Sequence, residues 1–432
     1  MHPSTSNVES KILSETTART AFSHILKITN FGVRYAGSEA DNKTIKYLEG
    51  CFKDYGLNVE IEAFKALCFE EKSSKLQILS PVKKEIDIRA MAYSTPTPED
   101  GITTEIVHIT EEAKGELTGK IAIFDRDPKL EKDCYWKEVN EIAKQGAEAA
   151  IMANHKPWIF IATLESGFFE AEKRFLPIEP KPIPAAITSS LDAQYIYHLM
   201  SKGPVEGSLQ INSIVEEKET YNVRAFIEGG ELKDERIIIC AHHDTEGTLG
   251  ANDNASGLAV VLELARILSK YKPKRTIEFL ATGAEEVCSI GSWNYCNMHK
   301  KDLENIKAVL NVDMIGVGGP LYLIREGRWP DKLIKTPEWL YNFVADIAHQ
   351  LNYEVKFGVC ELGTSDEGRF LDAGVPALFI WKPDDEYYHS PHDVPDRVDP
   401  NTLKVVADIV GVAVWKLANT EDLSEIIKRF GG

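Results

Sequence analysis

Four short apolar runs in the second half of the chain constrain the fold most strongly. They are residues 237–241 (IIICA), 276–281 (TIEFLA), 308–312 (AVLNV) and 377–381 (ALFIW). Apolar runs of this length predict buried strands of a parallel sheet. Between the first two runs, residues 256–271 place apolar side chains at three- and four-residue steps, which predicts an amphipathic helix. This alternation predicts an α/β fold, a mostly parallel mixed sheet with helices on both faces.

Ionisable residues gather at the ends of these predicted strands. Three of the runs lead into such residues within a few positions, and the fourth ends eight residues before a histidine. The carboxyl ends of parallel strands share one edge of the sheet, so we expect these side chains to converge there. Two imidazoles and four carboxylates suit zinc and, less well, cobalt or manganese. The six residues are His242, Asp253, Glu285, Glu286, Asp313 and His389.

These six residues are sufficient for a site with two metal ions. One shared aspartate, with a histidine and a second carboxylate on each metal, uses two histidines and three acids, so one acid is left over. The pair Glu285-Glu286 supplies it, because adjacent side chains of extended backbone point in opposite directions. The spare carboxylate would take a proton from an attacking water and pass it to the leaving amine. Asp244 could accept the second N–H of the His242 ring.

Length and charge restrict the protein class. A chain of 432 residues is longer than one compact core needs, which predicts two domains or one domain with an insertion. The formal net charge of -18 disfavours nucleic acid or an anionic membrane as a partner. The sequence shows no signal peptide and no apolar run of about 18 residues, so we expect a cytoplasmic protein without a membrane span. The seven cysteines form no C-x-x-C pair, as expected for reduced thiols.

Changes in the pattern of predicted helices and strands along the chain predict three regions. Residues 1–66 form an N-terminal helical part, in which the turn at 34–38 (RYAGS) separates two helices and an exposed-edge strand follows. Residues 67–215 form an inserted β-rich module. Residues 216–432 complete the catalytic domain, and the acidic stretch at 215–220 (VEEKET) is predicted to be a solvated crossing between the domains.

Six segments of the chain carry a family resemblance. They are AHHDTEG (241–247), GANDNASG (250–257), GAEE with IGS (283–292), LNVDMIG (310–316), TSDEGRF (364–370) and YHSPHD (388–393). Their order and spacing resemble the co-catalytic di-zinc exopeptidases, a family that includes aminopeptidase Y, bacterial leucyl aminopeptidases, glutamate carboxypeptidase and plasma carboxypeptidase. The inserted module, which contains GKIAIFD (119–125), QGAEAAIMAN (145–154) and IPAAITSSLDAQYI (183–196), resembles a protease-associated domain. The resemblance covers nearly the whole chain, and it implies a zinc exopeptidase fold and short peptides as substrates.

The resemblance implies a metal-binding role for five residues. Asp253 would bridge two zinc ions, for which cobalt or manganese could substitute. His242 and Asp313 would complete one zinc site, and Glu286 and His389 the other.

Catalytic roles also follow from the resemblance. It implies Glu285 as the general base and acid, Asp244 as the partner of the His242 ring, and Tyr388 as a hydrogen-bond donor to the oxyanion. The family commonly has a cis peptide after the bridging aspartate, here Asp253-Asn254. The chain departs from the family at His243, where tyrosine is frequent, and at Glu367, where histidine is frequent.

Several alternatives remain open at this stage. Asp366 and Arg369 either contact the substrate or hold the loop at 363–370 together, and Tyr388 could simply pack in the wall of the site.

Among the possible functions, we expect an aminopeptidase. A carboxypeptidase or dipeptidase would need a cation for the substrate carboxylate, with Arg325, Arg328 and Arg369 as candidates. A non-catalytic binding protein on the same fold should have lost metal ligands, and a single-zinc glutaminyl cyclase relative would not need two sites. A homodimer could form through the N-terminal helices or the inserted module.

Overall fold

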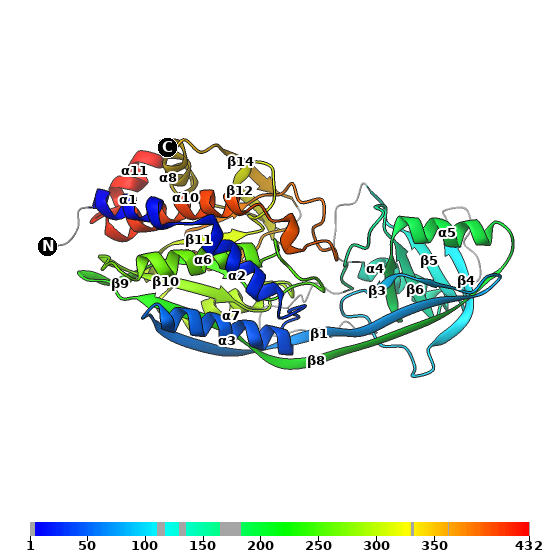
Figure 1. Ribbon diagram of the computed structural model, residues 1–432. Coiled ribbons are helices and arrows are strands. Elements are labelled where there is room, and N and C mark those ends of the chain that lie inside the picture. The colour runs from blue at the N-terminus through cyan, green and yellow to red at the C-terminus, as the bar shows by residue number, and fades with distance from the viewer. Residues whose placement is uncertain are drawn as a thin grey trace.

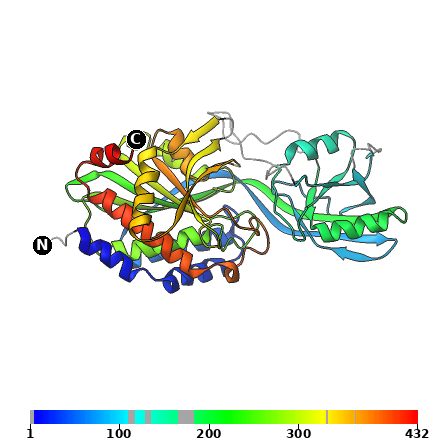
Figure 2. The same cartoon turned by 90° about the horizontal axis from the view of Figure 1, so that it is seen from above.

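The computed structural model describes residues 5–109, 117–128, 135–164, 183–329, 332–361 and 363–431. These residues form a larger and a smaller lobe (Figures 1 and 2). The long strands β1 (Asn58–Ser80) and β8 (Val205–Ile227) run through both lobes as one antiparallel ribbon. The larger lobe contains the chain on either side of this ribbon, and the smaller lobe is inserted at its far end.

The larger lobe is built on a mostly parallel mixed sheet, as predicted. Its four central strands are parallel neighbours, with β8 antiparallel on one side and β12 antiparallel on the other. Beyond β8, the first part of β1 forms the edge of this sheet. The central strands, in spatial order, are β10 (Arg275–Thr282), β9 (Leu232–His242), β11 (Ile306–Asp313) and β15 (Ala377–Trp381).

Strand β9 shows why the central runs are apolar without alternation. Ile237, Ile239 and Ala241 pack into the core on one face of the sheet, and Ile238 and Cys240 pack into a second core on the other face. Successive side chains of a strand point to opposite faces, so a strand covered on both faces must be apolar throughout. Cys68, Cys240 and Cys296 are buried free thiols.

Helices cover both faces of this sheet, and the packing of the two cores divides them into two groups. One group consists of α1 (Thr5–Glu15), α2 (Ala18–Thr29), α3 (Glu39–Asp54), α6 (Ala255–Leu268), α8 (Glu338–Gln350), α10 (Pro400–Asn419) and α11 (Leu423–Phe430). The other face is covered by α7 (Ile290–Met298) and α9 (Glu367–Asp372). Among the described helices, none combines the length and apolar character that crossing a membrane requires.

The N-terminal region differs from the prediction, since it contains three helices before β1 rather than two. The additional break lies at Thr17, whose hydroxyl accepts a hydrogen bond from the Thr20 N–H and caps α2. Such a cap starts a new helix within a stretch whose composition is helical on both sides.

The sheet continues through the ribbon into the smaller lobe, where β4, β5, β6 and β7 are parallel neighbours. Its elements are β2 (Lys84–Ile86), β3 (Ile88–Ala90), β4 (Ile102–Ile109), β5 (Ile121–Asp125), α4 (Trp136–Lys144), β6 (Ala149–Ala153), β7 (Ala185–Thr188) and α5 (Ser190–Met200). The larger lobe also contains β12 (Leu321–Trp329), β13 (Lys332–Lys335), β14 (Val355–Cys360) and the short 3₁₀ turns η1 (Leu303–Asn305) and η2 (Pro395–Arg397).

No loop separates the lobes at the predicted boundaries, because residues 67 and 215 lie inside β1 and β8. The two strands stay paired from Asn58 opposite Phe226 to Ser80 opposite Glu206. The acidic stretch at 215–220 is therefore part of a strand, and Glu217 pairs with Lys65 of β1 at 2.7 Å. The connection between the lobes is a hydrogen-bonded ribbon rather than a solvated linker.

Candidate metal centre

The parallel strands bring the predicted site residues to one edge of the sheet. His242 is the last residue of β9, and Asp313 is the last residue of β11. Glu285 and Glu286 lie in the turn that follows β10, and His389 lies in the loop that follows β15. Asp253 comes from the loop between β9 and α6. All these strands run in the same direction, so their carboxyl ends lie together.

The ligand atoms form two groups that share Asp253. In the first group, His242 Nε2 lies 3.2 Å from Asp253 Oδ1 and 3.4 Å from Asp313 Oδ1. In the second, His389 Nε2 lies 3.3 Å from Asp253 Oδ2 and 3.1 Å from Glu286 Oε2. One carboxylate thus presents one oxygen to each group.

The residues of these two groups fit divalent metal ions. Three of their buried atoms, His242 Nε2, Asp313 Oδ1 and His389 Nε2, have no hydrogen-bond partner among the described residues. Buried polar atoms are normally hydrogen-bonded. Imidazole nitrogens and carboxylate oxygens turned toward one another without hydrogen bonds are a donor set that suits zinc.

Two side chains outside the ligand groups hold the aspartates in place. The Asp393 carboxylate accepts the backbone N–H groups of Asn252 at 2.7 Å and Asp253 at 3.0 Å. The Ser365 hydroxyl donates to Asp313 Oδ2 at 2.7 Å, which leaves Oδ1 directed at the first group. The peptide bond Asp253-Asn254 is cis, as the family resemblance implied. The sequence patterns did not indicate a role for Asp393 or Ser365, although both lie within the matching motifs.

The structure corrects the predicted arrangement of Glu285 and Glu286. They lie in a turn that begins at Ala284, whose φ of 54° is left-handed, and not in extended backbone. The Asp244 carboxylate accepts both of their backbone N–H groups, at 3.0 Å from Glu285 and 3.2 Å from Glu286. The turn gives the two side chains different neighbours: Glu285 accepts a hydrogen bond from the Ser289 hydroxyl, whereas Glu286 lies against His389.

The predicted contact between Asp244 and the His242 ring is also different. His242 Nδ1 lies 3.2 Å from the Asp244 backbone carbonyl oxygen but 3.7 Å from its carboxylate. The backbone carbonyl therefore orients the imidazole, and it is positioned to accept the Nδ1 proton. The Asp244 carboxylate instead fixes the turn that carries Glu285 and Glu286.

Burial changes the acidity of this glutamate pair. It raises the pKa of the Glu285 carboxyl well above its usual value. It also raises the pKa of Glu286 to about 7. A carboxyl group with a raised pKa can exchange a proton with substrate near neutral pH, as a general base and acid must.

The N-terminal turn at 34–38 is hydrogen-bonded to the loop that follows β9, which carries Asp253. The fully buried Arg34 guanidinium donates to the backbone carbonyls of His243, at 2.8 Å, and Gly250, at 3.1 Å. His243 is buried as well, and its ring nitrogens contact Asp41 at 2.6 Å and the Tyr221 carbonyl at 2.8 Å. His243 thus packs in the interior, where both of its ring nitrogens have partners.

The smaller lobe reaches the metal centre, a contact that sequence reasoning did not find. The Ile161 N–H donates to the His389 carbonyl at 2.6 Å. The Phe160 ring lies 6.0 Å from the His389 ring and 6.2 Å from the Tyr388 ring. The Tyr388 ring in turn stacks on His389 at 3.8 Å. The loop that presents His389 is therefore held partly by the inserted lobe.

A cavity of about 430 Å³ opens beside both ligand groups. The charged residues that line it are Asp253, Glu285, Glu286, Asp313 and Asp385, and Tyr388 also lines it.

Asp366 and Arg369, for which the sequence left a substrate contact and a structural role open, do not line this cavity. Asp366 is fully buried, and its carboxylate accepts a hydrogen bond from the Thr282 hydroxyl. Arg369 donates to the Cys288 carbonyl at 2.5 Å. Both residues hold loops together, which was the structural alternative left open by the sequence.

This fold, with histidine and carboxylate ligand atoms at the carboxyl edge of the sheet, is that of a metal-dependent exopeptidase. Residues 222–414 match the model of peptidase family M28. The resemblance predicted from the motifs and the exopeptidase class are thus confirmed.

Known proteins similar to this chain include peptidases of two kinds. Aminopeptidase YwaD of Bacillus subtilis (strain 168) is 26% identical over 431 residues, covering 95% of this chain and 87% of that protein. Carboxypeptidase Q of Xenopus laevis is 25% identical over 419 residues, covering 92% and 85%. The structure of BSAP, a zinc aminopeptidase from Bacillus subtilis, has the same fold, with a TM-score of 0.75 and 22% identity over 94% of this chain and 96% of that one.

Proposed function

We propose that the protein is an aminopeptidase that uses two zinc ions to remove the N-terminal residue of short peptides. The charge of the cavity supports this choice. Every charged residue among its described lining residues is an acid, and none is lysine or arginine. A free N-terminus is a cation and needs a carboxylate partner, whereas a C-terminal carboxylate would need a cation.

Asp385 is the acid best placed to bind the substrate ammonium group. The other four acids of the cavity serve as metal ligands or as the general base in this proposal. The Asp385 carboxylate is oriented by the Asn252 amide at 2.8 Å and by the Tyr387 N–H at 2.9 Å. Burial raises the pKa of the Asp385 carboxyl. A cationic ammonium group bound beside it would lower this pKa again and favour the ionised form.

Apolar side chains form the wall of the cavity next to the acids. Met314, Phe379 and Trp381 line it, and the Phe379 and Trp381 rings stack with their centroids 5.4 Å apart. Such a wall favours peptides whose first residue is apolar.

The five ligand residues divide between two zinc ions. In our proposal Asp253 bridges the ions, His242 and Asp313 complete one site, and Glu286 and His389 complete the other. Zinc at these positions would supply Lewis-acid chemistry, which polarises the scissile carbonyl and makes water a better nucleophile.

Glu285 carries the proton during the reaction. Its carboxylate takes the proton from the attacking water and then gives it to the leaving amine nitrogen. Asp244 holds Glu285 in place through the backbone N–H of that residue, at 3.0 Å. Tyr388, on the cavity wall and stacked on His389, would donate a hydrogen bond to the negatively charged oxygen of the tetrahedral intermediate.

A carboxypeptidase and a non-catalytic binding protein, two of the alternatives that the sequence left open, have less support. Arg325 and Arg328 are exposed on β12, Arg369 is bonded to a backbone carbonyl, and none of the three lines the cavity. A carboxypeptidase would therefore lack a cation for its substrate among the described lining residues. A non-catalytic binding protein would not need to retain both ligand groups.

A panel of blocked peptides tests the proposal. Zinc-loaded protein should hydrolyse free and C-amidated tripeptides with an apolar first residue and should leave N-acetylated ones intact. Cleavage of N-acetylated but not C-amidated peptides would show a carboxypeptidase instead.

The role of Asp385 can be tested in the same assay. Asp385→Asn should raise KM for free peptides about 10- to 100-fold, because a hydrogen bond to a charged group is lost. Asp384→Asn, a neighbouring acid that does not line the cavity, is the matched control. An unchanged KM in Asp385→Asn would contradict ammonium recognition by this residue.

A further inference from the structure

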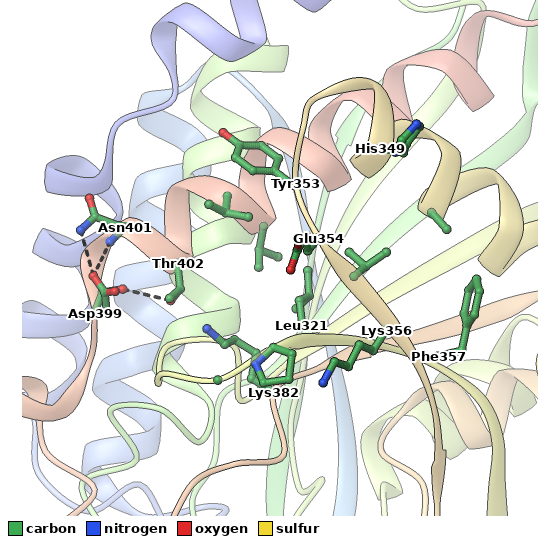
Figure 3. A pocket seen from close by; sticks show the side chains of 16 residues that line it. Leu321, His349, Tyr353, Glu354, Lys356, Phe357, Lys382, Asp399, Asn401 and Thr402 are labelled. Atoms are coloured by element: carbon green, nitrogen blue, oxygen red, sulfur yellow. Dashed lines mark hydrogen bonds between the residues drawn. The ribbon is translucent and has the colours of Figure 1, made fainter.

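A second cavity has no metal-ligand residue in the part of its lining that the structure describes and no part in the proposed reaction. Its volume is about 950 Å³, more than twice the 430 Å³ of the catalytic cavity. It lies between the C-terminal end of α8, the start of β14 and the first turns of α10, and Lys382 reaches it from the end of β15 (Figure 3).

The chain just after β15 forms the wall between the two cavities. Trp381 and Pro383 line the catalytic cavity, whereas Lys382 lines the second one. This follows from the extended chain, in which successive side chains point in opposite directions. The Lys382 N–H donates to the Met314 carbonyl at 3.2 Å, and Met314 also lines the catalytic cavity.

Lys382 is an uncommon lysine because it is buried without an ion pair. Its exposure is only 5%, and it forms no side-chain hydrogen bond or ion pair with any of the described residues. Two exposed carboxylates, Asp399 and Asp384, lie near enough to act on its charge but form no ion pair with it. Asp399 instead caps α10 by accepting the Asn401 backbone N–H at 2.9 Å. Burial lowers the pKa of the Lys382 ammonium. An ammonium group in this position is costly unless an anion accompanies it.

Apolar side chains form one part of the cavity wall, namely Leu321, Ala345, Val405 and Val406. Exposed charged side chains, Glu354, Lys356 and Asp399, form another part. A ligand that matches the apolar wall and Lys382 has one anionic group and an apolar body. A single buried cation suits a monovalent carboxylate better than a phosphate, which would need several cations or uncapped backbone N–H groups.

We propose that this second cavity binds a small organic carboxylate, with its carboxylate on Lys382 and its apolar body against Leu321, Val405 and Val406. The site is separate from the metal centre, so the proposal does not depend on the proposed peptidase specificity.

Calorimetric titration of the zinc-loaded full chain tests this site, with 4-methylpentanoate as the probe. One equivalent should bind with saturation. The amine of the same carbon skeleton, 4-methylpentan-1-amine, should not bind, because it would place a cation beside Lys382. Inorganic phosphate should bind at least tenfold more weakly than the carboxylate, because it has no apolar body. Absence of saturable carboxylate binding, or equal binding of the amine, would overturn the proposal.

Variants locate the binding to this cavity. Lys382→Met keeps the length of the side chain without its charge and should weaken binding at least tenfold. Lys356→Met, which removes an exposed lysine at the rim, is the matched control and should bind as the original protein does. If Lys382→Met unfolds, Val405→Phe, which places a larger side chain on the apolar wall, should weaken binding at least tenfold. Binding that survives Lys382→Met but is lost in His242→Ala would place the carboxylate on zinc and reject the site.

Discussion

The hydrogen bond from Ser365 to Asp313 offers a sharp test of how the metal centre is built. Ser365 and Asp313 are 4% and 6% exposed, and the hydroxyl donates to Oδ2 at 2.7 Å. A hydrogen bond to a charged group contributes about 1.5 to 3 kcal/mol. Ser365→Ala should therefore lower zinc affinity about 10- to 150-fold, the size of effect known for residues that orient metal ligands.

The effect should be confined to one of two zinc sites, because Asp313 belongs to only one group of ligand atoms. Titration of metal-free protein with zinc, against a chromophoric chelator, would resolve two affinities, and only one should fall. Ser213→Ala removes a buried serine that donates to the Ser94 carbonyl at 2.8 Å, and it should leave both affinities unchanged. If Ser365→Ala weakens both sites equally, or neither, the assignment of Asp313 to a single site is wrong.

Three further predictions test the site and the stability of the fold. Glu285→Gln should retain zinc but lower kcat by about 10²- to 10⁴-fold, as loss of a general base does, and near-normal turnover would reject this role. His242→Ala and Asp253→Ala should each lose zinc and the thermal stabilisation that bound metal provides, measured by elemental analysis and calorimetry; a full metal content would contradict the ligand assignment. Burial lowers the pKa of His24 to about 4, from about 6.5 in the unfolded chain, so its contribution to stability is present above pH 6.5 and is lost as the pH falls toward 4. Between pH 7.5 and 5 this loss should be about 2 kcal/mol of unfolding free energy, and urea titrations should show it removed in His24→Gln but kept in His198→Gln, an exposed control.

Much of the fold was predictable because it depends on local patterns. The buried strands β9, β10, β11 and β15 follow from apolar runs, and α6 follows from its three- and four-residue periodicity. Parallel strands share a carboxyl edge, so the convergence of His242, Asp313 and the Glu285-Glu286 pair also followed from the sequence.

Other features depended on contacts between distant segments. The turn that contains Glu285 and Glu286 is held by hydrogen bonds to the Asp244 carboxylate, about forty residues earlier in the chain. The continuous ribbon between the lobes did not follow from the sequence, because it depends on pairing between β1 and β8, which lie far apart in the chain. The contact of Ile161 with the His389 loop joins two lobes, and no periodicity within either segment reports it.

The sequence by itself determined which residues could bind metal and at which edge of the sheet they would meet. Only the tertiary structure decided how they are held and what surrounds them: Ser365 beside Asp313, an acid-lined cavity beside the ligands, and Lys382 buried in a separate cavity one residue from the catalytic wall. The reason is physical. Strands and helices follow from patterns of residues that are neighbours in the sequence. The hydrogen-bond partners, the cavities and the local charge depend instead on which distant segments the folded chain brings together.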